Sequence, residues 1–87
     1  MQTIPVMIEA KGRQGDLIKY SKDSDKIDLS TKSVQKYAVN GAVHYTMALL
    51  EGHACTECLA VGINGYLKED QSLQTEVAVY YLSLKKF

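Results

Sequence analysis

Three short apolar segments and one long amphipathic segment set the predicted architecture. Residues 4–11, 57–64 and 75–82 are rich in strand-forming side chains. Between the first two, apolar and small residues recur at helical steps of three and four, at positions 34, 37, 38, 41, 45, 48 and 49. They predict a helix from about Thr31 to Glu51, with Ser30 or Thr31 as its N-cap and Gly52 as its stop.

The order strand, helix, strand, strand predicts an α/β fold with a small mixed sheet of about three strands. The continuous apolar run at 57–64 is typical of a strand buried on both faces, which favours parallel pairing with the first strand through one long crossover helix. The short link after it favours an antiparallel hairpin with the last strand. Gly41 lies on the apolar stripe of the helix, where a small residue would let the helix approach the sheet closely. We expect residues 1–87 to form a single domain.

Composition argues against three classes of protein: an independent nucleic-acid binder, a membrane protein and a disulfide-stabilised secreted protein. Ten basic and ten acidic residues cancel, whereas a protein that grips nucleic acid on its own usually has a basic excess. No apolar run approaches the roughly 20 residues that span a bilayer, and no secretory signal is apparent, so we expect no membrane segment. Two cysteines three positions apart make a poor disulfide framework, and a cytoplasmic location is expected.

Residues 12–30 are polar and rich in turn formers, and two predictions stay open for them. Small apolar patches flank a polar centre at 21–26, so this segment is either a short β-hairpin or a surface loop. Asp23, Asp25 and Asp28 alternate as they do in calcium loops. An EF-hand counted from Asp23, however, would need Gly at position 28 and Glu at position 34, where Asp28 and Val34 stand, so we reject a calcium loop and expect solvated charges.

The first strand ends in two charges of opposite sign. Successive side chains of a strand point to opposite faces, so Glu9 and Lys11 share one face and Ala10 lies on the other. A charge near a core usually has a partner or a task. The alternative is that the strand simply ends here and both charges are solvated.

The segment Ile8-Glu9-Ala10-Lys11, followed by Gly12, resembles the Glu-x-Lys half of the PD-(D/E)xK signature of restriction endonucleases, including those fused to methyltransferases. The likeness extends to residues 34–42 and 61–66. It implies a restriction-endonuclease-like core, DNA as substrate and Mg²⁺ as cofactor. It also implies that Glu9 and the carbonyl of Ala10 bind the metal, while Lys11 lies beside the attacking water. Gln35, near the start of the helix, is a further candidate for the site.

The family takes a second acidic ligand from a strand before Glu-x-Lys, but only Met1, Gln2 and Thr3 precede the strand here. We therefore expect a fragment of a larger nuclease domain, inactive alone, whose exposed sheet edge favours a homodimer. Asp16 is the nearest candidate for a substitute carboxylate. The alternative is a small non-catalytic α/β interaction or regulatory module.

A rival site lies at His53, Cys55 and Cys58. Cys-x-x-Cys with a nearby histidine is half of a zinc site, which would make the chain a zinc-stabilised module. His44 is the only other histidine and no third cysteine exists, so the fourth ligand is in doubt. Cys58 also begins the predicted buried strand, where cysteine behaves as a small hydrophobe.

Overall fold

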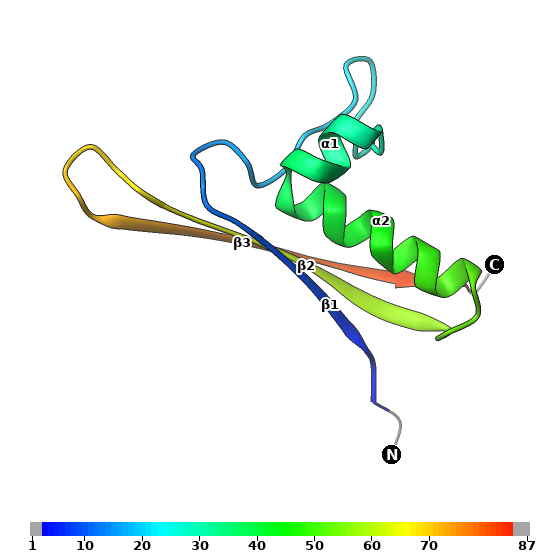
Figure 1. Cartoon of the computed structure of the whole chain (residues 1–87). Helices are drawn as coiled ribbons and strands as arrows, with labels where there is room; N and C mark the ends of the chain where they lie inside the picture. The colour runs from blue at the N-terminus through cyan, green and yellow to red at the C-terminus, as the bar shows by residue number, and fades with distance from the viewer. Residues whose placement is uncertain (1–2, 85–87) are drawn as a thin grey trace.

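A computed structural model describes residues 3–84 and shows three strands and two helices (Figure 1). In chain order they are β1 (Val6–Lys11), α1 (Thr31–Lys36), α2 (Ala38–Glu51), β2 (Glu57–Leu67) and β3 (Leu73–Ser83). The sheet has the order β1-β2-β3, with β1 parallel to β2 and β2 antiparallel to β3. The predicted α/β class, the mixed three-stranded sheet and both pairing directions are confirmed.

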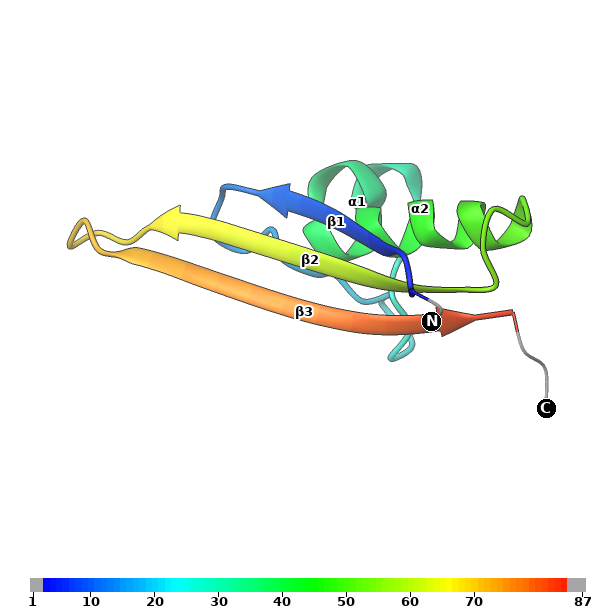
Figure 2. The ribbon, with the colours of Figure 1, turned by 90° about the horizontal axis from the view of Figure 1, so that it is seen from below.

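The molecule has two layers, because both helices lie on the same face of the sheet (Figure 2). We call this the helix face and the other the open face. The core lies between α2 and the sheet, where Val39, Ala42 and Val43 of α2 pack with Ala60 of β2. The partly buried Met7 of β1 packs against this cluster. Within residues 3–84, no helix has the length and apolar character needed to cross a membrane.

The prediction of one helix from Thr31 to Glu51 is wrong, because the chain breaks at Tyr37. Tyr37 is extended, with φ −107° and ψ 138°. In an unbroken helix the amides of residues 38 and 39 would bind carbonyls four residues earlier. Here the Ala38 amide donates to the Asp16 carbonyl at 2.9 Å and the Val39 amide to the Leu17 carbonyl at 2.8 Å. The loop before α1 thus satisfies the first amide donors of α2. The spacing of apolar side chains could not predict this, because the bonds are between main-chain atoms.

The segment 12–30 contains the hairpin-like turn that the sequence left open. Tyr20 and Ile27 form an isolated antiparallel bridge, and the Ser21 amide donates to the Lys26 carbonyl at 2.8 Å. Asn40 of α2 fastens this turn from inside: its side chain accepts from the Lys19 amide at 3.0 Å and donates to the Lys19 carbonyl at 2.9 Å and the Asp28 carbonyl at 2.6 Å. Asn40 is fully buried, and these three bonds hold the loop against α2.

Strand β2 is not buried on both faces as predicted. Its side chains alternate between buried positions on the helix face and half-buried positions on the open face, because no described element covers the open face. The hairpin is also longer than expected. Strand pairing continues to Leu67 and Leu73, so the turn spans only residues 68–72.

Candidate functional site

Glu9 and Lys11 lie side by side on the helix face at the end of β1. The Lys11 Nζ is 3.6 Å from the Glu9 Oε1, and the two side chains are 26% and 30% exposed, respectively. They are therefore neither free in solvent nor sealed in the core. An ion pair at this depth is only partly shielded from solvent, so a ligand can still reach it.

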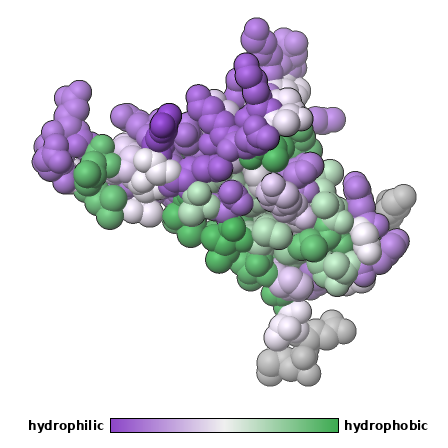
Figure 3. Space-filling view, in the orientation of Figure 1, coloured by the Kyte–Doolittle hydropathy of each residue, from purple (hydrophilic) through white to green (hydrophobic). Residues whose placement is uncertain are grey.

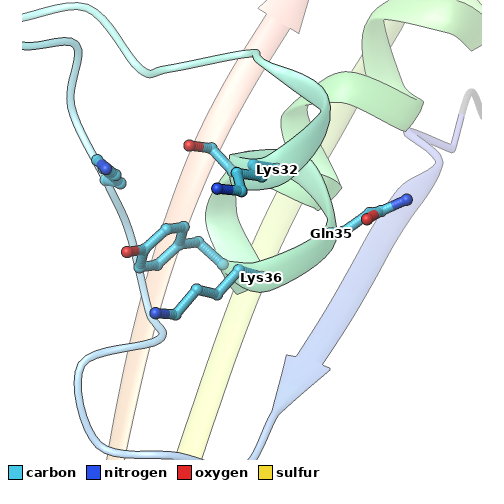
Figure 4. Close-up of a pocket in the computed structure, with 6 residues that line it drawn as sticks. Lys32, Gln35 and Lys36 are labelled. Atoms are coloured by element: carbon cyan, nitrogen blue, oxygen red, sulfur yellow. The ribbon is translucent and has the colours of Figure 1, made fainter.

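The break between the helices supplies a partner for Lys11. The Gln35 carbonyl would accept from the Val39 amide in a continuous helix, but Val39 donates to Leu17 instead. The Lys11 Nζ donates to this freed carbonyl at 2.8 Å. Gln35 therefore contributes to the site through its main chain. Its side chain extends from α1 toward β1 (Figure 4).

Glu9 packs against the first turn of α2. A Cβ atom at Gly41 would lie 3.3 Å from the Glu9 Cγ and 2.9 Å from the Val34 carbonyl oxygen. The close approach predicted for Gly41 is thus correct, and the atoms that require it belong to Glu9 and to the end of α1. The N-terminal end of a helix favours a nearby carboxylate. The first amides of α2 are occupied by the loop, so this is a field effect without direct hydrogen bonds to them.

Asn64 of β2 lies in the same region, and the sequence analysis did not predict it as a site residue. It pairs in register with Lys11 on one side and Glu76 on the other. It is fully buried, and its Nδ2 donates to the Arg13 carbonyl at 2.7 Å and to the Glu76 Oε1 at 3.2 Å. Its Oδ1 is buried and has no hydrogen-bond partner. A polar amide at the end of an apolar strand run was the available signal.

A basic pocket lies on the other side of Gln35. It has a volume of about 420 Å³ and is lined by Lys19, Lys32, Ser33, Gln35, Lys36 and Tyr37. Lys32 and Lys36 point to the side of α1 opposite β1 (Figure 4), and the Lys36 Nζ lies 5.5 Å from the centre of the Tyr37 ring. The balanced net charge therefore hides a local concentration of three ammonium groups, which suits an anionic ligand such as a phosphate.

The predicted metal ligands are brought together only in part. The Ala10 side chain has no metal-binding atom and lies on the open face, so Ala10 could contribute only its carbonyl beside the Glu9 carboxylate. Within residues 3–84, no three residues of the types His, Cys, Asp and Glu gather in a group that could hold a metal. Asp16 is buried in the loop that meets the start of α2. One carboxylate and one carbonyl fit part of an Mg²⁺ shell, which water and phosphate oxygens often complete.

The rival zinc site is not assembled in the part of the chain described, because His53, Cys55 and Cys58 do not form a metal-binding group. Cys58 is buried on the helix face, with its Sγ 3.9 Å from the Thr46 Oγ1. Cys55 is half-buried. Burial, together with the neighbouring Cys58, raises the pKa of the Cys55 thiol.

Comparison of the chain with protein-family models, curated proteins and solved structures finds no match.

Proposed function

We propose that this chain is part of an Mg²⁺-dependent DNA endonuclease domain that hydrolyses phosphodiester bonds. The observation that carries the proposal is the position of Lys11. Its ammonium group lies between the Glu9 carboxylate and the Gln35 carbonyl, and Gln35 also lines a pocket on the other side of α1 that contains three further lysines. A carboxylate, an oriented ammonium group and a basic pocket for backbone phosphates are three elements that support phosphodiester hydrolysis.

Each residue has a defined role in this proposal. The Glu9 carboxylate and the Ala10 carbonyl would hold the metal, which when bound would supply positive charge and an activated water. Lys11 orients the water and neutralises charge that develops on the phosphate. The hydrogen bond to the Gln35 carbonyl fixes the ammonium group, so little reorganisation is needed when substrate binds.

The basic pocket binds the DNA backbone in this proposal. Phosphate contacts position a duplex without reading its sequence, and lysine ammonium groups supply them. Lys19, Lys32 and Lys36 line the pocket, and Gln35 connects it to Lys11. Three lysines give a weak, salt-dependent grip, so tight binding requires further surfaces of the parent protein.

The chain alone is expected to be inactive, because among residues 3–84 Glu9 is the only carboxylate assigned to the proposed site. Without a second acidic ligand, Mg²⁺ would be held weakly and its water would be poorly positioned. The proposed activity therefore belongs to a larger nuclease domain, and the tests of this chain measure binding.

Titration of ¹⁵N-labelled protein with Mg²⁺, followed by NMR, tests the metal site. We expect shifts that centre on the amides of Glu9, Ala10 and Lys11 and that disappear in Glu9→Gln. Glu57→Gln is the matched control, because Glu57 lies on the open face of the sheet. No localised shift at millimolar Mg²⁺, or equal shifts in Glu9→Gln, would reject Glu9 as a ligand.

Titration with a short DNA duplex at low salt tests the pocket separately. We expect the amides of α1 to shift and Lys32→Gln to weaken binding about threefold to tenfold, in line with the loss of one phosphate contact. Lys68→Gln, in the turn of the β2–β3 hairpin, is the control and should leave binding unchanged. Equal effects of the two substitutions would show that the pocket is not the binding surface.

A second candidate is a non-catalytic interaction module, and one observation favours it. The open face of the sheet exposes large apolar side chains, among them Ile8, Val77 and Val79, each more than half exposed. Large exposed apolar patches mark interaction surfaces. Absence of both the Mg²⁺ and the DNA response would leave this candidate as the better description of the chain.

A further inference from the structure

The open face carries a patch of nine apolar side chains that no described element covers. The strand register arranges them in three rows across the sheet: Val6, Leu59 and Tyr81; Ile8, Val61 and Val79; Ala10, Ile63 and Val77. The edge-strand members are strongly exposed: Val6, Ile8, Val77, Val79 and Tyr81 are between 52% and 58% accessible. Figure 2 looks onto this face with the helices behind it, and Figure 3 shows hydrophobic residues gathered over the strands below a hydrophilic cap.

We propose that the open face is the interface of a face-to-face homodimer, in which two copies of this chain pack their sheets together into a β-sandwich. This differs from pairing through a sheet edge, because no main-chain hydrogen bonds join the copies. It is also independent of the Glu9–Lys11 site, which lies on the helix face.

The size of the face fits a dimer. Strands β2 and β3 have 11 residues each and β1 has six. With a rise of about 3.4 Å per residue and a strand spacing of about 4.8 Å, the face has a flat footprint of roughly 450 Å². Two copies give roughly 900 Å². The accessible surface of side chains exceeds their flat projection, so a full overlap reaches the low end of specific interfaces, at about 1,200 Å².

The charges of the face permit contact between two copies. Glu57 is the only charged residue at the open-face positions of the three strands. Its Oε2 already accepts a hydrogen bond from the Tyr81 hydroxyl at 3.1 Å. Stacking two copies therefore buries one carboxylate from each copy, and that carboxylate already has a hydrogen-bond partner. The absence of lysine and arginine from these same positions argues against a membrane surface, which basic residues on such a face would favour.

The three rows also allow a symmetric pairing of two copies. A two-fold axis that runs across the strands at the middle row would stack the Ile8–Val61–Val79 rows of both copies. It would place the row that contains Tyr81 against the partner's row that contains Ala10. Val6 would then face the partner's Ala10, Leu59 its Ile63 and Tyr81 its Val77, so apolar side chains would meet apolar side chains in every row. The strands of the two sheets would cross at about −30°, the usual angle of aligned sandwiches.

Sedimentation of the full chain over a range from micromolar to submillimolar concentration tests the proposal. We expect a monomer–dimer equilibrium that Val79→Lys shifts at least about a hundredfold toward monomer, because the lysine would be buried without a partner. Val79 is 58% exposed in the single chain, so its replacement leaves the fold of the monomer intact, which circular dichroism verifies. Tyr45→Lys, at a 49% exposed position on α2, is the matched control and should leave the equilibrium unchanged.

A second measurement separates the face from the edge. In a mixture of labelled and unlabelled chains, we expect intermolecular contacts between the methyl groups of Ile8, Val61 and Val79. Intermolecular contacts confined to the backbone of β1 or β3 would show an edge dimer and overturn the proposal. A monomer at all concentrations, or a monomer that binds phosphatidylcholine vesicles through this face, would overturn it as well.

Discussion

The start of α2 lies directly on the middle of β2: a Cβ atom at Gly62 would be 2.7 Å from the backbone nitrogen of Val39 and 2.6 Å from its Cγ2. Gly62 pairs in register with Glu9. The same close contact therefore sets the height of the helix above the sheet and the space left for the Glu9 side chain beside Gly41.

Gly62→Ala should destabilise the fold by about 1–3 kcal/mol, because the added methyl group meets helix backbone that cannot rotate away. Urea unfolding followed by circular dichroism measures the change. Gly65→Ala in the same strand is the matched control, since the nearest atom to its Cβ is the Gln74 carbonyl oxygen at 4.0 Å. That substitution should be neutral or slightly stabilising. Equal losses in the two variants would contradict the close packing of α2 on β2.

Asn40→Ala should cost roughly 2–3 kcal/mol of folding free energy, because it leaves the amide and carbonyl of Lys19 and the carbonyl of Asp28 without their buried partner. Chemical denaturation gives the magnitude. Hydrogen exchange should show faster exchange of the Lys19 amide, which donates to the Asn40 Oδ1. A loss below about 0.5 kcal/mol would place Asn40 outside the network that holds the loop.

Asp28 should make folding stability depend on pH in the acid range. The Ser30 amide at 2.9 Å and the Ser33 hydroxyl at 3.0 Å donate to its carboxylate, and they lower the pKa of Asp28 in the folded chain. A depressed folded-state pKa adds stability above the unfolded-state pKa of about 3.9, and this stability is lost as pH falls through the folded-state value.

The test compares unfolding of the wild type and Asp28→Asn at pH values from neutral to strongly acidic. The wild type should be the more stable at neutral pH, and the difference should shrink as the Asp28 carboxylate becomes protonated. Asp25→Asn is the matched control, because Asp25 lies in the exposed turn of the same loop and accepts neither of these two hydrogen bonds. A difference that stays constant with pH would mean that the two hydrogen bonds do not favour the ionised form.

Cys55 should react slowly with alkylating reagents. Burial is the main cause that raises its thiol pKa, and Cys58 beside it adds to the effect, so less of the reactive thiolate is present near pH 8. Cys58 is fully buried and should not react in the folded chain. Alkylation of Cys58→Ala, followed by mass spectrometry across a pH series, measures the Cys55 thiol alone. Labelling as fast as in the urea-unfolded protein would refute the shift.

The approximate strand positions and their pairing were predictable because apolar segments rich in strand-forming residues, and the lengths of the links between them, indicate both. The placement of Glu9 and Lys11 on one face followed from the same alternation. The hydrogen-bond partner of Lys11 could not be predicted from the sequence, since the Gln35 carbonyl becomes available only through the break at Tyr37. That break depends on carbonyls of Asp16 and Leu17 in a polar loop. Main-chain hydrogen bonds between distant segments leave no trace in side-chain periodicity.

The burial of Asn40 and Asn64 could not be predicted from the sequence either. Both are fully buried amides in segments whose buried positions are mostly apolar. From sequence, Asn40 is one polar position in a helix and Asn64 is the polar end of a strand. Their roles depend on backbone carbonyls of Lys19, Asp28 and Arg13, which only the folded loop brings within reach.

The parallel pairing of β1 with β2 has a consequence for the order of folding. Each residue of β1 pairs with one 53 positions later, as Val6 does with Leu59, whereas the β2–β3 hairpin closes through a short turn. Closing the longer segment has the higher entropic cost and is the slower step. The hairpin should therefore form early and β1 should dock last, so the Glu9–Lys11 pair assembles only at the final stage of folding.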